Sequence, residues 1–269
     1  MEWLSSRLAA PWWSLVTAYA PLMLAVFVLE RLFAARGADP KGAGLNLRYI
    51  LVALAVEVLL VDAALQPLLQ PAVDALRSPL AAFRALAAQP PVWLQYLLQV
   101  AAIDFFYYWT HRAQHRIALL WRIHELHHSE PSFNVTTTLR VHWLEGPMKF
   151  VTVLVPAALL VDAPAGVPAL LAWVGGAWLF FIHANARISF GPLNRLLVSP
   201  AVHRVHHSSE RAHRDKNFAA YFSLWDVLFG TYHAPPAGRW PDVGTDGPPP
   251  RSALAAHLRP FRTPTASDR

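Results

Sequence analysis

Long apolar stretches dominate the first 110 residues and predict helices that cross a membrane. A spanning helix needs about 20 mostly apolar residues, and three stretches have that length: Trp12–Phe33, Tyr49–Leu69 and Pro91–Trp109. Further along, two apolar stretches at Phe150–Val161 and Ala163–Ile182 are separated by a turn rich in proline and glycine. Because the first of this pair is too short to span, the pair predicts a helical hairpin that enters the bilayer and returns.

These patterns predict an all-α integral membrane bundle of three spanning helices plus a re-entering hairpin, capped by a histidine-rich helical region. Residues 1–99 would hold the N-terminal membrane helices, and residues 100–233 the histidine-rich domain, including the hairpin at 146–183. Residues 234–269 are rich in proline and predict a loose tail with one short helix at Ser252–Leu258. Basic residues cluster after the first span, which places that loop, and with it the histidines, on the cytoplasmic side.

Composition supports a membrane protein and restricts the chemistry. Of 269 residues, 55% are hydrophobic and 15% are charged, against about 25% charged in an ordinary soluble domain. The formal net charge of +6 comes from basic residues that flank apolar stretches and form no long basic run, so we exclude nucleic-acid binding. The absence of cysteine excludes thiolate metal sites, thiol nucleophiles and disulfides. Any metal must be held by histidines and carboxylates.

The histidines are patterned. None of the 13 falls in the first 110 residues. His111 and His115 are spaced i, i+4, which places both rings on one helical face. Two motifs repeat the spacing i, i+3, i+4: HELHH at His124, His127 and His128, and HRVHH at His203, His206 and His207. We expect each triplet to converge on a single point from one helical turn.

Neutral imidazole is a common ligand of zinc, copper, iron and nickel. With His142 and His183, the patterned histidines supply ten donors, enough for two metal ions with about five each and positions left for a small molecule. A pH-sensing patch of solvated histidines gives no reason for the repeated spacing. We expect His213 to lie at the surface or beside the ligands, and His233 and His257 to be solvated.

The segments that carry these histidines resemble the membrane-bound fatty acid hydroxylase and sterol desaturase superfamily. The resemblance covers about residues 100–232 and lies in six segments: DFFYYWTHRAQH, LWRIHELHHS, TTTLRVHWLE, HANARI, SPAVHRVHHS and DKNFAAYFSLWDVLFGT. It departs from the family pattern where Trp143 replaces a proline and where Ala219 replaces a glycine. The first departure makes His142, together with His183, the weakest of the ligand assignments.

The resemblance implies an enzyme that uses a pair of histidine-bound irons and dioxygen to hydroxylate or desaturate a lipid C–H bond. Zinc could replace iron during preparation. Ten metal ligands follow: His111, His115, His124, His127, His128, His142, His183, His203, His206 and His207. Because a ligand histidine usually donates its other N–H to a carboxylate or carbonyl, we expect Asp104 to support His111 and Glu145 to support His142, with Asn185 and Asp226 as further candidates.

The sequence contains no Rossmann glycine fingerprint and no haem motif, so electrons must come from a partner such as a ferredoxin, a cytochrome or a reductase. The lipid substrate would reach the site from the bilayer. Two other classes remain open: a membrane protein that binds or transports metal, and a zinc-dependent lipid hydrolase. Transport would need ligands along the spans, and hydrolysis needs only three protein ligands.

Overall fold

The computed structural model describes residues 55–162, 168–250 and 252–261, together with residues 21, 24–28, 30, 32, 46, 48, 49 and 51–53. Within these residues the chain folds into helices joined by loops, with one isolated backbone bridge between Ser208 and Val243. The α-helices are α4 (Gln66–Arg77), α5 (Ala81–Ala87), α6 (Val92–Arg116), α7 (Ala118–His128), α8 (Glu145–Lys149), α9 (Val155–Leu160), α10 (Pro168–Ile182), α11 (Pro200–His206), α12 (Leu224–Leu228) and α13 (Ala253–Leu258).

Shorter or wider helical turns link these helices. Two are π-helical, η1 (Glu57–Leu65) and η4 (Phe150–Leu154). Five are 3-10 turns: η2 (Ser78–Leu80), η3 (Val135–Leu139), η5 (Gly191–Arg195), η6 (Arg211–His213) and η7 (Arg259–Phe261).

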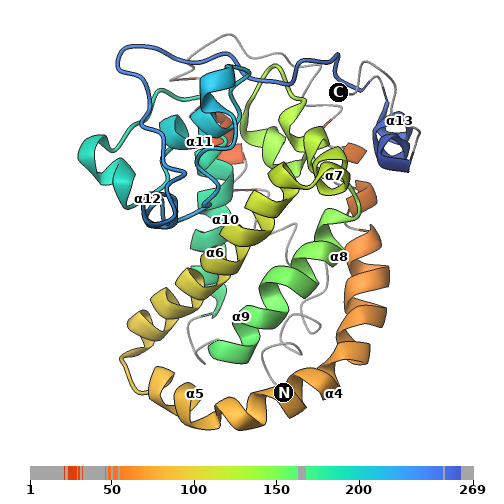
Figure 1. Cartoon of the computed structure of the whole chain (residues 1–269), viewed down its shortest axis with the longest axis vertical. Coiled ribbons are helices and arrows are strands. Elements are labelled where there is room, and N and C mark those ends of the chain that lie inside the picture. Colours follow the sequence, from red (N-terminus) through yellow and green to blue (C-terminus); the bar gives the residue numbers. More distant parts are fainter. Residues whose placement is uncertain are drawn as a thin grey trace.

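Helix α6 is the axis of the structure (Figure 1). It runs diagonally from α5 to α7, packs against α7 at its C-terminal end, and contacts η4 and α9 along its length. Helices α4, α5 and α9 lie around the first half of α6, whereas α7, α10 and α11 gather around its second half (Figure 1). The histidines all lie in or near that second group.

The prediction of a three-span membrane bundle with a re-entering hairpin is wrong for the described part of the chain, where no helix is both long enough and apolar enough to cross a membrane. The stretch Tyr49–Leu69 is divided between η1 and α4. The stretch Pro91–Trp109 lies in α6 from Val92 onward, but Gln95, Gln99 and Asp104 interrupt its apolar sequence.

The remaining apolar stretches also depart from the prediction. The hairpin region forms the short elements α8, η4, α9 and α10 instead of two long helices. Most of Trp12–Phe33 lies outside the described residues. Where that stretch is described, Glu30 is buried and its carboxylate accepts hydrogen bonds from the backbone N–H groups of Val135 and Asn185, at 2.6 and 2.7 Å. Glu30 therefore joins two loops near the histidines.

A hydrophobic cluster holds together the segments that carry the histidines. Its buried members include Tyr108 of α6, Ile182 of α10, Val202 of α11 and Phe218 of the following loop. These elements are far apart in the sequence, so burial of their apolar side chains, at about 25 cal/mol per Å², brings distant histidines into one place.

Candidate metal centre

A single extended residue folds the second histidine segment onto the first. Helix α6 ends at Arg116, and Ile117, with φ −102° and ψ 115°, leaves the helical conformation before α7 begins at Ala118. The chain therefore reverses within one residue, and α7 packs back against α6. The last two turns of α6 and the last two turns of α7 then face each other with their histidines between them.

Helix α11 brings the third histidine segment. Ser199 precedes it, and its hydroxyl accepts a hydrogen bond from the backbone N–H of Val202, while Pro200 occupies the first helical position. Both features are favoured at a helix start, so the sequence fixes where α11 begins. The histidines of α11 then face α7.

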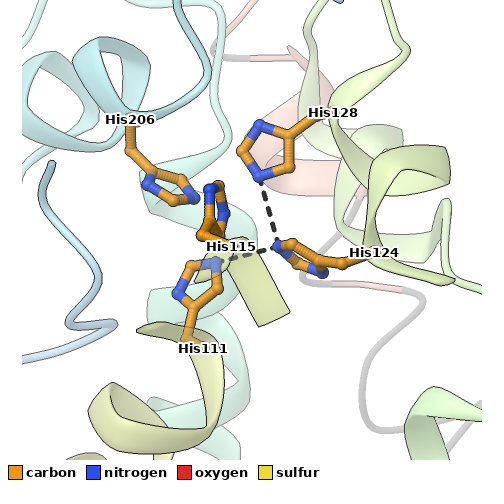
Figure 2. A group of neighbouring side chains, drawn as sticks. All are labelled: His111, His115, His124, His128 and His206. Atoms are coloured by element: carbon orange, nitrogen blue, oxygen red, sulfur yellow. Dashed lines mark hydrogen bonds between the residues drawn. The ribbon is translucent and has the colours of Figure 1, made fainter. Parts of the chain in front are cut away.

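Five buried or nearly buried histidines from three helices form the first group: His111, His115, His124, His128 and His206 (Figure 2). Their candidate ligand atoms all lie within 4.8 Å of one another. His124 Nε2 lies 2.9 Å from His111 Nε2 and 3.2 Å from His128 Nε2. We call this set the five-histidine group.

A second set, the four-histidine group, lies beside the first and consists of His127, His183, His203 and His207. His183 Nε2 lies 3.1 Å from His127 Nε2 and 2.9 Å from His203 Nε2. The two groups touch where the rings of His128 and His207 stack, with centroids 4.3 Å apart. The structure thus places two candidate metal sites next to each other.

The expectation that each triplet converges on one point is wrong, because each triplet divides between the two groups. In α7, His124 and His128 belong to the five-histidine group and His127 to the four-histidine group. In α11, His203 and its i+4 partner His207 face the four-histidine group, whereas His206 faces the other. Residues i and i+4 lie within about 40° around a helix, but i+3 lies about 60° to the other side. A triplet therefore serves two neighbouring points.

Oxygen atoms fix the orientation of four rings. A carbonyl or carboxylate oxygen can only accept, so the Nδ1–H of His111 donates to the Phe218 carbonyl at 2.7 Å and that of His124 donates to Glu145 at 3.2 Å. In the same way His183 Nδ1 donates to the Leu179 carbonyl at 2.7 Å and His206 Nδ1 to the Lys216 carbonyl at 2.8 Å. In the neutral rings, Nε2 then carries a lone pair directed into the group.

Burial favours the neutral form of eight histidines in the two groups. Burial, followed by the neighbouring histidines, holds the pKa of six of them well below the usual value: His111, His115, His127, His128, His203 and His207. Burial also lowers the pKa of His183 to about 4 and that of His206 to about 3. Neutral imidazole is the form that binds metal.

The donor set fits metal ions. The lone pairs of His111 Nε2 and His124 Nε2 face each other at 2.9 Å, and two acceptors at that distance need a proton or a cation between them. A proton would satisfy one pair, whereas a metal ion satisfies all the lone pairs that converge on one point. Further buried nitrogens have no hydrogen-bond partner, namely Nε2 of His115, His206 and His207. Each group therefore has the composition and geometry of an all-imidazole metal site.

Comparison with known proteins agrees with this chemistry. A sequence model described as fatty acid hydroxylase matches residues 96–231, half of the chain. The chain belongs to the fatty acid hydroxylase family. The histidine segments of the sequence resemble this same family, and the family depends on iron.

Named relatives cover the same region. An ornithine lipid hydroxylase of Rhizobium tropici is 34% identical over 176 residues, which are 64% of this chain and 52% of that protein. The alkylglycerol monooxygenase of Homo sapiens is 36% identical over 132 residues, 49% of this chain and 29% of that protein. A very-long-chain aldehyde decarbonylase of rice (Oryza sativa subsp. japonica) is 27% identical over 149 residues, 50% of this chain and 22% of that protein. The chain thus spans about half or less of these relatives, and no solved structure matches it.

The structure of this fatty acid hydroxylase family member brings together nine of the ten expected ligands and leaves out His142. His142 is buried, but its Nε2–H donates to the His257 carbonyl at 2.9 Å and its Nδ1 accepts from the backbone N–H of Leu144 at 3.2 Å. Both ring nitrogens are therefore occupied. His257, expected in solvent, is buried against His142 and Tyr49 and holds α13 in place.

Replacing His142 with alanine should therefore lower stability without lowering metal content. The change leaves the buried His257 carbonyl without its donor, which costs about 1–3 kcal/mol. Urea unfolding measures the loss of stability, and metal analysis of the folded variant measures the ions per chain. His233→Ala, at a half-buried ring that bonds the neighbouring Ala234 carbonyl, should change neither quantity. A loss of metal in folded His142→Ala protein would instead make His142 a ligand.

The expected carboxylate partners also differ from the sequence prediction. Glu145 bonds His124 instead of His142, and it also pairs with Lys149 at 2.6 Å. Burial by itself would raise the pKa of Glu145, but Lys149 and His124 together lower it below its usual range. Glu145 is therefore an anionic acceptor that orients His124 in the five-histidine group.

Asp104 does not contact His111 directly. Its carboxylate accepts from the backbone N–H groups of Ala220, Tyr221 and Phe222, at 2.9, 3.1 and 2.7 Å. Burial raises the pKa of Asp104 to about 7, against the lowering effect of these three N–H groups. Sequence spacing placed Asp104 on the face of His111 but could not identify the loop that lies between them.

His213 and Phe133 complete the surroundings of the α11 histidines. His213 is buried, with Nδ1 2.9 Å from the Ser208 hydroxyl, and belongs to neither group. The buried Phe133 ring contacts the rings of His183, His203 and His207, the closest being His207 at 4.8 Å between centroids. Phe133 thus covers the four-histidine group with an apolar surface, a contact that no motif in the sequence indicates.

Proposed function

We propose that this protein is a di-iron oxidoreductase that uses dioxygen to hydroxylate a C–H bond of a lipid. Nine histidines would hold the irons: His111, His115, His124, His128 and His206 for one, and His127, His183, His203 and His207 for the other. The proposal depends chiefly on one observation, the two adjacent groups of buried imidazoles whose candidate ligand nitrogens converge. A pair of irons bound there would activate dioxygen for attack on an unactivated C–H bond.

The residues around the irons have separate tasks. Glu145 and the carbonyls of Phe218, Lys216 and Leu179 keep the Nδ1 protons of four ligand rings away from the metal side. Phe133 excludes water from one side of the four-histidine group. Imidazole ligands leave the ions a net positive charge, which suits reduction by an external donor.

The names of the relatives favour hydroxylation of a lipid over desaturation. The bacterial relative is named for hydroxylation of ornithine lipid and the human relative for monooxygenation of alkylglycerol. Both names describe a molecule with an apolar part, lipid or alkyl, and a polar part, ornithine or glycerol. We propose a substrate of that general type for this chain, an amphiphile whose reacting carbon lies near the polar head.

The first half of the described structure offers a surface for such a lipid. Large apolar side chains are exposed on α4, α5 and the start of α6, among them Leu68 at 72%, Leu86 at 63% and Trp93 at 66% exposure. Contiguous exposed apolar surface marks contact with a membrane or a partner. We therefore propose that the protein meets its substrate at a membrane. The cytoplasmic side for the histidines remains the prediction made from the basic residues of the sequence.

The electrons are proposed to come from a separate protein, a ferredoxin, a cytochrome or a reductase. Reduction of dioxygen during hydroxylation needs two electrons besides those of the C–H bond. The sequence lacks the motifs of a nicotinamide, flavin or haem domain. The donor must therefore dock on the surface of this chain.

The two alternatives from the sequence account for fewer of the observations. A zinc hydrolase needs three protein ligands and one open position, which leaves most of the nine histidines without a task. A transport protein needs ligands spaced along a path, whereas these nine gather in two adjacent groups.

Metal analysis combined with oxygen consumption tests the proposed function. Protein purified without oxygen should contain about two metal ions per chain and, loaded with ferrous iron and given a chemical reductant and lipid, should consume dioxygen. Bound zinc without oxygen consumption after iron loading would favour the hydrolase. A folded protein with no metal would contradict all three functions.

Comparative lipid mass spectrometry then identifies the substrate. Cells that contain the protein should accumulate a lipid heavier by one oxygen atom than its counterpart in cells without it. A lipid lighter by two hydrogens would instead indicate desaturation. The His128→Ala variant provides the control for effects of expression alone.

A further inference from the structure

The loop after α11 presents two backbone carbonyls to the five-histidine group. Asp215 and Asn217 both have positive φ, 58° and 57°, a conformation that is uncommon outside glycine. Between and after them, the Lys216 carbonyl faces His206 Nδ1 and the Phe218 carbonyl faces His111 Nδ1. This strained backbone aims two acceptors at ligand rings from two different helices.

Two buried carboxylates hold the loop in this shape by binding five consecutive backbone N–H groups. Asp226 accepts from Phe218 at 2.7 Å and Ala219 at 3.0 Å, and also from the Thr231 hydroxyl at 2.7 Å. Asp104 accepts from the next three N–H groups, at residues 220–222. Both carboxylates are fully buried. Burying a carboxylate is costly unless it is hydrogen-bonded, and here all the backbone N–H donors belong to one loop.

Within the described residues, the rings of the four-histidine group are not oriented by this loop. His183 follows directly after α10 and is oriented by the carbonyl of Leu179 in the last turn of that helix. Among the described contacts, no ring nitrogen of the four-histidine group bonds to residues 214–222. The two groups therefore differ in what the loop does for them.

We propose that Asp226 and Asp104 are positioning residues that act through this loop on the five-histidine group alone. They keep the Phe218 and Lys216 carbonyls in place, and these carbonyls in turn fix the tautomer and direction of His111 and His206. Metal binding at the five-histidine group depends on both carboxylates, and metal binding at the four-histidine group does not. This proposal rests on the proposed function only in taking the two groups as metal sites.

Cobalt binding to the full chain tests the proposal without lipid or dioxygen. Asp226→Asn keeps the size of the side chain but replaces one acceptor oxygen with an NH₂ group, which faces a backbone N–H. Changes to groups that support a metal ligand typically weaken affinity about 10–100-fold. Titration of metal-free protein with Co²⁺, followed by visible absorption, should show one site of unchanged affinity and one site weakened by that factor. Asp104→Asn should give the same result.

Double variants identify the site that is weakened. After passage over a chelating resin, Asp226→Asn should retain about one ion per chain. Addition of His207→Ala should remove that ion, because His207 belongs to the four-histidine group, whereas addition of His128→Ala should cause no further loss. Asp246→Asn is the matched control: its carboxylate bonds Arg214 at 2.7 Å beside the same loop but is 74% exposed. This control should retain two ions.

Two results would overturn the proposal. In the first, Asp226→Asn and Asp104→Asn both bind two ions with wild-type affinity. In the second, both sites weaken together and the melting temperature of the metal-free protein falls, as a purely structural role requires. A wild-type protein that binds two ions but oxidises no lipid would contradict the proposed function and leave this inference intact. A wild-type protein that binds no Co²⁺ would contradict both.

Discussion

Lipid oxidation is expected to disappear when His128 or His207 is replaced with alanine. The two rings stack at the contact between the groups, and each change removes one candidate ligand that no neighbouring side chain replaces, since His142 is occupied by His257. Product formation should fall to the level of membranes without the protein, and each variant should retain about one metal ion. Lipid mass spectrometry measures the product, and elemental analysis measures the metal.

The control for these variants is His233→Ala, which removes a histidine of the same region that lies in neither group. It should keep full activity and two ions. His257, which the sequence places in a solvated tail, is unsuitable as a control because it is buried and supports α13. Full activity in His128→Ala together with lost activity in His233→Ala would show that the two groups are not the metal sites.

Mild acid is expected to unfold the metal-free protein. Unfolded histidine takes up a proton near its usual pKa of about 6.5, whereas burial holds His183 near 4 and His206 near 3. The stability that depends on these neutral rings is therefore complete above pH 6.5 and is lost as the pH falls toward their folded pKa values. Each of the two costs about 2 kcal/mol by pH 5, and the other lowered histidines add to the loss in the same direction.

Urea unfolding of the metal-free protein at pH 7.5 and at pH 5 measures this effect. The total stability of a domain is about 5–15 kcal/mol, so we expect a large fall in the urea midpoint or complete unfolding at pH 5. Bound metal should move the transition to lower pH, because the ion competes with protons for Nε2. An unchanged midpoint at pH 5 would mean that the histidines are hydrated in the metal-free state and not buried together.

The sequence identified the site better than it identified the fold. The spacings in HxxxH, HELHH and HRVHH selected eight of the nine gathered histidines, and the family resemblance supplied the ninth, His183. The spacing could not assign each ring to one of the two groups. Positions i+3 and i+4 lie about 100° apart around the helix, and the group that each ring joins also depends on which other helices face it. The partners of the rings are mostly backbone carbonyls, such as those of Phe218 and Lys216, which have no side-chain signature.

The membrane-span prediction was wrong for a related reason. Counting apolar residues gave little weight to Gln95, Gln99 and Asp104, which lie on α6 among the apolar positions. Asp104 is compensated by a loop more than 100 residues later in the chain, a contact that no local pattern contains. His142 was included as a ligand because its segment resembles a histidine-bearing segment of the family, yet both of its ring nitrogens bond to backbone groups. Its i+3 spacing from Glu145 made Glu145 its expected partner, but α8 begins only at Glu145.

The division of the triplets has a consequence for how the protein is made. Four members of the five-histidine group lie between residues 111 and 128, so they leave the ribosome almost together. At that point the four-histidine group has only His127, and it gains His183 and the two α11 histidines much later in translation. A growing chain therefore offers a nearly complete set of donors for one ion well before the second can be held. Under the proposed function, the five-histidine group would therefore be able to bind its ion early in synthesis, and the four-histidine group only after α11 has folded against α7.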